Sequence, residues 1–446
     1  MTKPPATGLP RRAALLLPLA AAGCNTIDNL FSEAKPPLPG KRESVGAARR
    51  GLALEGPAVA VTVPPPAAVA DWPQAGGNAT HAVGHIAMSG SAGFQPAWRS
   101  SIGEGGGYRR KVTAQPLIAG SRVFTMDSDG LVAAFDLASG SRIWRTDTQG
   151  EKNRSTNVGG GIAVAGNTLF AATGRGDALA MDAGTGAIGW RKGLDSPARS
   201  APCVADGRLF ITTLDNRLLA LKAADGDRQW SYQAATAATT VLAQSAPAFS
   251  DGLVVAGFGS GDLAAVRAES GGLAWTDSLA SSRGRNSLVD LAAVRGLPVV
   301  DRGRVFAIGV GGLLVSLDLR SGRRLWEREV GGLETPWLAG DVLFVQTLDQ
   351  TLAAVGRDDG KLRWLTDLPR YDNPEKRRNP LFWTGPILAG GRLVLAGSNE
   401  TALSVDPVNG RVIGQQDLRA AAAVTPVAAA GTLLILTDDG SLQAFR

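Results

Sequence analysis

The sequence has only two cysteines and two histidines in 446 residues, and this restricts the chemistry that it can support. Cys24 and Cys203 are far apart, and we expect Cys24 to be modified, so we predict no internal disulfide. His81 and His85 are spaced as zinc ligands on a helix would be, but the glycine-rich stretch 76–84 disfavours a helix and offers no third ligand. No serine, histidine and acid constellation is evident. We therefore expect no catalytic residue, no metal site and no cofactor.

The sequence also lacks a large charge excess. Its 46 basic and 40 acidic residues give a net charge of +6. Residues 1–23 contain Lys3, Arg11 and Arg12 and no acid, so the remainder has 43 basic and 40 acidic residues. Binding to nucleic acid requires cations gathered on one face. This balance gives no support for a nucleic-acid partner.

The N-terminal apolar run, "AALLLPLAAAGC", is too short to span a bilayer. Its cationic start and the small residues before Cys24 indicate an export signal over residues 1–23. The run resembles a bacterial lipobox, which implies a diacylglyceryl group and palmitate on Cys24. Asn25, in place of the aspartate typical of inner-membrane retention, implies an outer-membrane destination. Residues 24–70 are rich in proline and alanine, and we interpret them as the lipidated cysteine and a flexible tether.

Glycine and proline are abundant, at 57 and 25 residues, and they follow a repeat. The unit opens on a proline, or on Ile162 in one copy, and has a glycine 24 residues later. A tryptophan follows at 28 residues, with Gly414 in that place in the seventh copy. The opening residues are Pro116, Ile162, Pro202, Pro247, Pro298, Pro336 and Pro386. The glycines are Gly140, Gly186, Gly226, Gly271, Gly322, Gly360 and Gly410. The tryptophans are Trp144, Trp190, Trp230, Trp275, Trp326 and Trp364.

Each unit contains four short, β-branched, alternating runs between turn signals, as in "LIAG", "RVFTMDSDG", "LVAAFDLASG" and "RIWR". Four strands at a period of 38 to 51 residues are typical of propeller blades. We predict an all-β, eight-bladed propeller over residues 71–446, with four antiparallel strands per blade. The tryptophans lie on the outermost strand and are interpreted as structural. The seventh seam, where Gly414 replaces the indole, is expected to be the weakest.

The last copy runs from Pro426 to Arg446 and has only three strands, whereas "QPAWRSSIGEG" carries Trp98 ahead of the first complete unit. We predict that this N-terminal strand completes the last blade. Closure of the ring would remove the open sheet edge between the first and last units.

Strands alternate in direction, so the connections between blades and the turns between second and third strands should share one face. Two connections are long, at 277–297 and 365–385, and insertions on one face of a repeat protein commonly bind partners. They combine charged and apolar residues of the kind found in interfaces. The candidate partner-binding residues are Leu242, Arg283, Arg285, Leu288, Asp290, Arg295, Arg370, Tyr371, Phe382 and Trp383.

The lipobox, the tether, "DWPQAGGNATHAVGH", "AWRSSIGEGGG" and the eight quinoprotein-like repeats together resemble the BamB lipoproteins of the outer-membrane β-barrel assembly machinery. The resemblance implies a non-enzymatic scaffold on the periplasmic face of the outer membrane, held by its lipid. It implies binding to the POTRA domains of BamA, an association with other Bam lipoproteins, and help with the folding and insertion of outer-membrane proteins as clients. In that family the contact is attributed to the loops before the fourth and fifth blades, here 237–244 and 282–296. Leu242 and Ala293 depart from the residues common there.

Two other interpretations stay open. Quinone-dependent (PQQ) dehydrogenases resemble this chain in their eight-bladed ring and a "DWP…GG" opening, but they typically carry adjacent cysteines and acidic calcium ligands. Cys24 and Cys203 are the only cysteines here. A propeller that binds the cell wall or another polysaccharide is the third possibility.

Overall fold

The computed structural model describes residues 51–53, 59–88, 94–108, 110–150, 157–237, 245–280 and 292–446. These residues belong to the compact unit that spans Gly46–Arg446, and they form β-strands and loops. The described part of the chain contains no helix able to cross a membrane.

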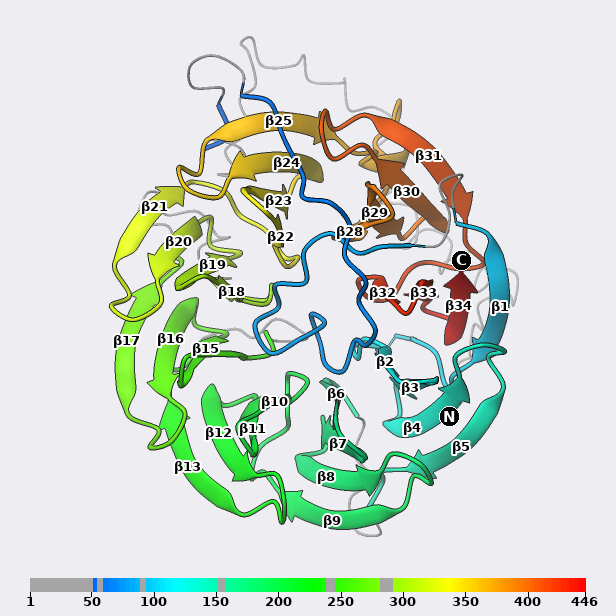
Figure 1. Cartoon of the computed structure of the whole chain (residues 1–446), viewed down its shortest axis with the longest axis vertical. Helices are drawn as coiled ribbons and strands as arrows, with labels where there is room; N and C mark the ends of the chain where they lie inside the picture. The colour runs from blue at the N-terminus through cyan, green and yellow to red at the C-terminus, as the bar shows by residue number, and fades with distance from the viewer. Residues whose placement is uncertain are drawn as a thin grey trace, which may run out of the picture. The chain divides into compact units, whose positions relative to one another are not determined.

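Eight four-stranded antiparallel sheets are arranged as blades around a central axis (Figure 1). Blade 1 comprises β2 (Leu117–Ala119), β3 (Arg122–Met126), β4 (Leu131–Asp136) and β5 (Arg142–Asp147), and blade 2 comprises β6 (Gly160–Ala165), β7 (Thr168–Thr173), β8 (Asp177–Asp182) and β9 (Ile188–Gly193). Blade 3 comprises β10 (Cys203–Ala205), β11 (Arg208–Thr212), β12 (Arg217–Lys222) and β13 (Arg228–Gln233), and blade 4 comprises β14 (Ala248–Ser250), β15 (Leu253–Gly257), β16 (Asp262–Arg267) and β17 (Leu273–Ser278). Blade 5 comprises β18 (Val299–Asp301), β19 (Arg304–Ile308), β20 (Leu314–Asp318) and β21 (Arg324–Arg328), and blade 6 comprises β22 (Trp337–Ala339), β23 (Val342–Gln346), β24 (Thr351–Gly356) and β25 (Leu362–Asp367). A separate hairpin of β26 (Tyr371–Asn373) and β27 (Arg378–Pro380) precedes blade 7, which comprises β28 (Trp383–Ala389), β29 (Arg392–Gly397), β30 (Thr401–Val405) and β31 (Val412–Asp417).

Blade 8 joins the two ends of the propeller. Its first three strands are β32 (Val427–Ala429), β33 (Thr432–Leu436) and β34 (Ser441–Phe445), and its fourth is β1 (Pro96–Ser101). β1 pairs antiparallel with β34, with Trp98 opposite Ala444 and Ser101 opposite Ser441. The eight-bladed fold and its closure by the N-terminal strand are thus confirmed.

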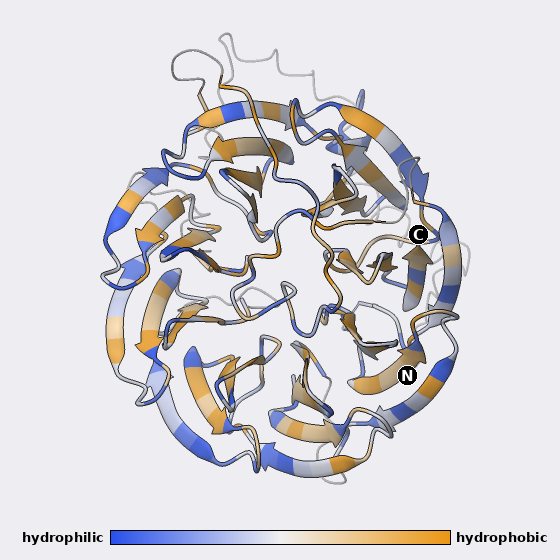
Figure 2. Cartoon of the chain, in the orientation of Figure 1, coloured by the Kyte–Doolittle hydropathy of each residue, from blue (hydrophilic) through white to orange (hydrophobic). Residues whose placement is uncertain are grey.

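The inner strands of each blade are apolar and buried, whereas the outermost strands alternate between exposed and half-buried residues. The second and third strands carry runs of three or more buried residues, with four in β4 and six in β24. The outermost strands β5 and β31 both show a pattern of period two. Figure 2 shows this radial change from hydrophobic inner strands to mixed outer ones. The core therefore lies between neighbouring blades.

Seven tryptophans connect each blade to the next. Each indole N–H donates to a backbone carbonyl of the following blade over 2.7–3.2 Å, and each ring lies against the glycine of that blade's outer hairpin. The pairs are Trp98 with Leu137, Trp144 with Ala183, Trp190 with Ala223, Trp230 with Ala268, Trp275 with Leu319, Trp326 with Arg357, and Trp364 with Pro407. Each of these tryptophans therefore packs at the seam between two blades.

The seam between blades 7 and 8 has no such indole. Gly414 occupies the tryptophan position on β31, opposite Ser404. Blade 8 has no outer hairpin to receive an indole, because its third and fourth strands belong to opposite ends of the chain. Gln95 and Arg446 hydrogen bond to one another there, over 2.8 and 2.9 Å. The lower stability of this seam stays a prediction.

Residues 59–88 form a segment, here called the plug, that closes one end of the central channel (Figure 1). It hydrogen bonds to the innermost strand of every blade. Its partners, from blade 1 to blade 8, are Ile118, Val164, Val204, Phe249, Val300, Trp337, Leu388 and, one residue beyond β32, Ala430. Trp72 is 1% exposed and stacks on Trp337 with ring centroids 6.2 Å apart.

The plug changes one expectation from the sequence, which is the extent of the tether. The tether was expected to extend to residue 70, but Val61 is buried, and the carbonyl oxygens of Pro64 and Val69 accept hydrogen bonds from His85 and Ala430. Residues 59–70 therefore pack on the propeller, because their backbone satisfies polar groups around the channel. Cys24 and residues 25–50 and 54–58 lie outside the described residues, so the signal and tether stay predictions.

Candidate functional site

The plug and the connections between blades lie on opposite faces of the propeller. The innermost strand of each blade begins at the connection from the previous blade and ends near the plug, as β2 does where Ile118 pairs with Trp72. The outer glycine hairpins share the plug's side because strands alternate in direction. We call the other side, which carries the connections between blades, the open face. Its centre is a blind funnel, since the plug forms its floor.

The funnel holds a cleft of about 100 Å³ on the axis. Ala75 of the plug and Gln115 line its floor, where the Gln115 side-chain oxygen accepts a hydrogen bond from the Gly76 N–H over 2.9 Å. Most of the other lining residues occupy the three positions before the opening residue of each repeat. They include Thr113, Arg199, Ser200, Arg295, Glu334 and Thr425. The funnel wall is therefore a ring of corresponding positions, one short run from each blade.

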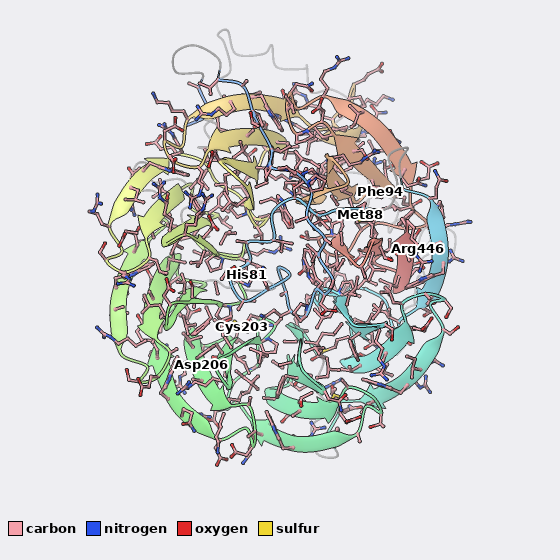
Figure 3. All side chains as sticks on the ribbon, in the orientation of Figure 1. His81, Met88, Phe94, Cys203, Asp206 and Arg446 are labelled. Atoms are coloured by element: carbon pink, nitrogen blue, oxygen red, sulfur yellow. The ribbon has the colours of Figure 1, made fainter. Side chains whose placement is uncertain are left out.

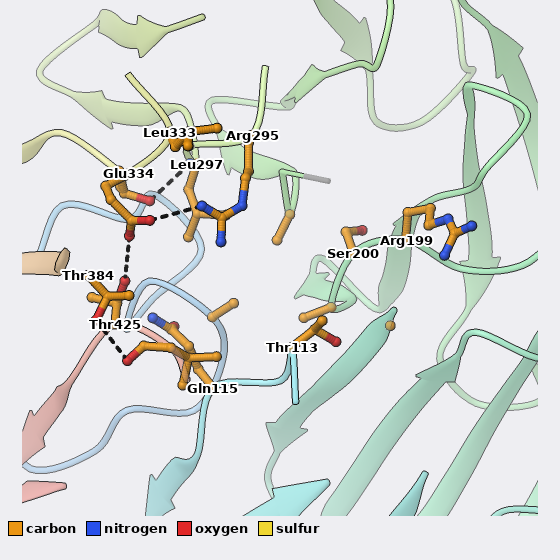
Figure 4. Close-up of a pocket in the computed structure, with 17 residues that line it drawn as sticks. Thr113, Gln115, Arg199, Ser200, Arg295, Leu297, Leu333, Glu334, Thr384 and Thr425 are labelled. Carbon is orange, nitrogen blue, oxygen red and sulfur yellow. Dashed lines mark hydrogen bonds and ion pairs between the residues drawn. The ribbon is translucent and has the colours of Figure 1, made fainter. Parts of the chain in front are cut away.

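Glu334 is the centre of the polar network in this cleft (Figure 4). One carboxylate oxygen pairs with Nη1 of Arg295 at 2.9 Å. The other accepts hydrogen bonds from Oγ1 of Thr425 at 3.1 Å and from the Gly385 N–H at 3.4 Å. The Glu334 side chain is only 11% exposed, so these partners replace the water that it loses. The network links the connections that lead into blades 5, 6, 7 and 8.

A second groove, of about 280 Å³, continues from the funnel toward the rim between blades 6 and 8. Lys111 and Phe382 are among its walls, and Arg295 and Glu334 are shared with the central cleft. Asp438 also lines it, and burial raises the pKa of this carboxyl while the charge of Lys111 opposes the shift. The groove thus combines an exposed aromatic ring with charges of both signs.

Of the predicted partner-binding residues, the structure describes Arg295, Arg370, Tyr371, Phe382 and Trp383. Arg295 lines both the cleft and the groove. Arg370 and Tyr371 lie at the base of the β26–β27 hairpin, where Arg370 pairs with Asp349 and Asp367 at 3.3 and 3.2 Å. Leu242, Arg283, Arg285, Leu288 and Asp290 lie outside the described residues, and their roles stay predictions.

Phe382 and Trp383 are adjacent but differ in burial. Phe382 is 57% exposed at the groove, whereas Trp383 is 2% exposed. The Trp383 indole N–H donates to the Pro369 carbonyl at 2.9 Å, and its backbone N–H donates to Gln350 at 3.2 Å. The assignment of Trp383 as a surface contact is therefore wrong, because its side chain packs in the core.

Glu334, Lys111 and Gln115 are site residues that the sequence analysis missed. The signal was present in the repeat alignment, because Glu334 and Gln115 stand two and one positions before Pro336 and Pro116. The corresponding positions of all eight blades line the funnel, so an alignment of these positions would have identified the residues of its wall. Lys111 precedes Pro116 by five residues, outside these aligned positions, so only the tertiary structure places it at the groove.

The two histidines belong to the plug and have structural partners. His81 lies near the centre of the ring (Figure 3), and its Nδ1–H donates to the Pro298 carbonyl at 2.7 Å. His85 donates to the Pro64 carbonyl at 2.7 Å and accepts from the Gly391 N–H at 2.9 Å. Burial lowers the pKa of His81 to about 4 and raises that of the Cys203 thiol to about 12. No cluster of three metal-ligating side chains occurs among the described residues.

The funnel does not fit the quinone cofactor of the dehydrogenase interpretation. The lining contains no cysteine, and the buried Cys203 lies on β10, without an adjacent cysteine. The carboxylate of Glu334, which lines the cleft, already accepts hydrogen bonds from Arg295 and Thr425.

Comparisons with solved structures show the fold. The crystal structure of BamB from Moraxella catarrhalis matches with a TM-score of 0.68 and 18% identity, covering 79% of this chain and 100% of that one. A quinohemoprotein alcohol dehydrogenase from Comamonas testosteroni matches with a TM-score of 0.66 and 12% identity, covering 84% and 80%. At these identities the likeness shows only the propeller fold, which a BamB protein and an alcohol dehydrogenase share.

Comparisons of sequence distinguish between the BamB family and the dehydrogenases. A family model described as outer membrane protein assembly factor BamB matches residues 128–366 and 348–446. The BamB protein of Yersinia pestis is 30% identical over 361 residues, covering 79% of this chain and 89% of its own. The Escherichia coli protein of the same name is 29% identical over 356 residues, covering 78% and 88%. The chain therefore belongs to the BamB family of outer membrane protein assembly factors.

Proposed function

We propose that this chain is a non-enzymatic scaffold of the outer-membrane β-barrel assembly complex, bound to the POTRA domains of BamA and to other Bam lipoproteins. It assists the folding and insertion of outer-membrane proteins, and lipid on Cys24 holds it at the periplasmic face of the outer membrane. Family membership is the observation that carries this proposal. The open face supports it, because the connections between blades gather there around a blind funnel.

The loops before blades 4 and 5 are the proposed POTRA contact. β13 ends and β14 begins at the open face, and the same is true of β17 and β18, so both loops attach there. Arg295, near the end of the second loop, pairs with Glu334 at 2.9 Å, which attaches that end of the loop to the connection into blade 6.

The test is the affinity of the full-length chain for the purified POTRA region of BamA from the same organism. Replacing residues 282–290 by a glycine–serine linker of equal length should weaken binding at least about tenfold, because interface energy is concentrated in few residues. Lys361→Glu on an outer hairpin of the plug side, where the side chain is exposed, is the matched control. Equal binding by the linker variant and the wild type would remove this loop from the interface.

Lipid attachment and catalysis need separate measurements. Mass spectrometry of the mature N-terminus should show an acylated Cys24, and Cys24→Ala should release the protein into the soluble fraction. Addition of pyrroloquinoline quinone and Ca²⁺ should produce no dye reduction with alcohols or sugars. Any turnover would support the dehydrogenase alternative, and sedimentation with purified cell-wall polysaccharide would support the third.

A further inference from the structure

The connection into blade 7 forms a well-anchored projection on the open face. β26 and β27 pair antiparallel, with Tyr371 opposite Pro380 and Asn373 opposite Arg378. The Leu381 N–H donates to the Arg370 carbonyl at 2.8 Å, closing the base of the hairpin. The ion pairs of Arg370 with Asp349 and Asp367 attach this base to blade 6. The base of the hairpin is therefore attached to blade 6.

Three consecutive cations occupy the tip and second strand of this hairpin. Lys376, Arg377 and Arg378 are all exposed, and none of them makes an ion pair with the part of the chain that the structure describes. Adjacent like charges repel one another and destabilise a compact fold. Mutual repulsion among these three cations therefore does not stabilise the hairpin.

Phe382 follows Arg378 by four residues, and its backbone is hydrogen bonded on both sides. Its N–H donates to Oγ of Ser398 at 3.0 Å, and its carbonyl accepts from the Ser398 N–H at 2.9 Å. The following residue, Trp383, is locked in the core. The Phe382 side chain is 57% exposed, so part of its apolar surface is in contact with water. A partner protein could cover this surface. The ring faces the groove that Lys111 also lines.

We propose that Lys376, Arg377, Arg378 and Phe382, here called the blade-7 surface, dock an acidic segment of a partner protein that also carries an apolar side chain. The three cations complement the acidic groups, and the apolar side chain packs on Phe382 in the groove of about 280 Å³. This inference rests on the proposed function as a scaffold and adds a second contact, apart from the loops before blades 4 and 5.

The concave form of the surface favours a protein segment over an anionic lipid layer. A second cleft, of about 640 Å³, lies beneath the hairpin and is lined by Arg370, Tyr371, Pro374 and Arg377. A polypeptide can insert side chains into such a cleft, whereas a flat headgroup layer contacts only the tip. Lipid binding is therefore an outcome that the test must detect separately.

The test places the photo-crosslinking residue p-benzoyl-phenylalanine at position 382 of the full-length chain, in cells of the source organism. Position 413 is the matched control, because Ile413 is 54% exposed on the outer strand β31. Crosslinked peptides are sequenced by mass spectrometry. We expect an adduct at 382 on a peptide with clustered Asp and Glu, and little adduct at 413.

The charge dependence is tested in the same cells. The triple variant Lys376→Glu, Arg377→Glu and Arg378→Glu should lower the yield at 382 at least about fivefold, since charge complementarity guides such contacts. Arg323→Glu, Lys361→Glu and Arg411→Glu change three exposed cations on the plug side and should leave the yield unchanged. Thermal unfolding of both triple variants confirms that they fold.

The outcomes separate this inference from the proposed function. An adduct in an acidic segment of BamA or a Bam lipoprotein supports both. An adduct in an acidic segment of another protein supports the blade-7 surface and counts against the proposed partner. An adduct on lipid alone, equal yields at 382 and 413, or a yield that the charge reversal leaves unchanged overturns the inference.

Discussion

At the scale of single residues, the pairing of a tryptophan with a glycine of the next blade decides how the blades join. Gly271 has φ +73°, and a methyl group on it would lie 2.8 Å from the Trp230 ring. Gly252 has nearly the same φ, +74°, but a methyl group there would meet nothing within 4 Å. Both glycines belong to turns of blade 4. Replacing each glycine by alanine therefore distinguishes two contributions to the loss of stability. Both variants place alanine in a left-handed backbone conformation, but only Gly271→Ala also displaces the Trp230 indole.

Gly271→Ala should destabilise the protein by about 3–4 kcal/mol, whereas Gly252→Ala should cost about 1 kcal/mol. The difference is the steric conflict with Trp230 and the strain on its hydrogen bond to the Ala268 carbonyl. Denaturant unfolding of the two variants measures it. Equal losses of unfolding free energy in the two variants would show that the packing of the Trp230 indole does not require glycine at position 271.

His81 makes the stability depend on pH. Burial lowers its pKa to about 4 from an ordinary value of 6.5, so the unfolded chain binds more protons between these values. The stabilising contribution is therefore complete above about pH 6.5 and is lost as the pH falls to about 4, by about 3 kcal/mol in total. His81→Asn keeps a side-chain donor and tolerates the positive φ of this position. It should flatten the stability profile over this range, and an unchanged slope would exclude His81 as the cause.

At the scale of elements, the plug is the part that touches all eight blades. It has no sheet of its own, and its backbone completes the hydrogen bonding of the innermost strands at the axis. A chain that begins at residue 89 retains β1 but lacks the plug. We expect it to form the propeller with an unfolding temperature lower by about 10 °C or more, since several buried N–H groups lose their partners. Hydrogen exchange at Val164, Phe249 and Val300 should accelerate, and unchanged protection would contradict the role of the plug.

At the scale of the whole molecule, ring closure depends on one strand from the N-terminal side. A chain that begins at residue 103 also lacks β1, so β34 becomes an open edge in blade 8. Open edges pair with other chains, so this truncation should aggregate where the chain beginning at 89 stays monomeric. Deletion of residues 71–102 should have the same effect. Sedimentation velocity compares them, and a monomeric, cooperatively folded 103–446 fragment would contradict closure by β1.

The repeat, the four-stranded blades and the closing strand could be predicted because each has a local signal at a fixed position within the repeat unit. The repeat alignment places Glu334 two positions before Pro336 and Arg295 three positions before Pro298, but it does not show that their side chains pair. Their meeting depends on eight blades converging on an axis. Phe382 and Trp383 are a second example of what the sequence could not determine. Alternation along the chain indicates that neighbouring side chains point in opposite directions, but it does not show which of the two is buried.

Local patterning of apolar and turn residues was enough to specify the blades, because each strand and hairpin is formed by neighbours in the chain. The buried Trp383, the Glu334 network and the packing of residues 59–88 over the channel arise from contacts between segments far apart in sequence. Burial and hydrogen bonding at the axis depend on all eight blades at once, so they follow only from the assembled ring.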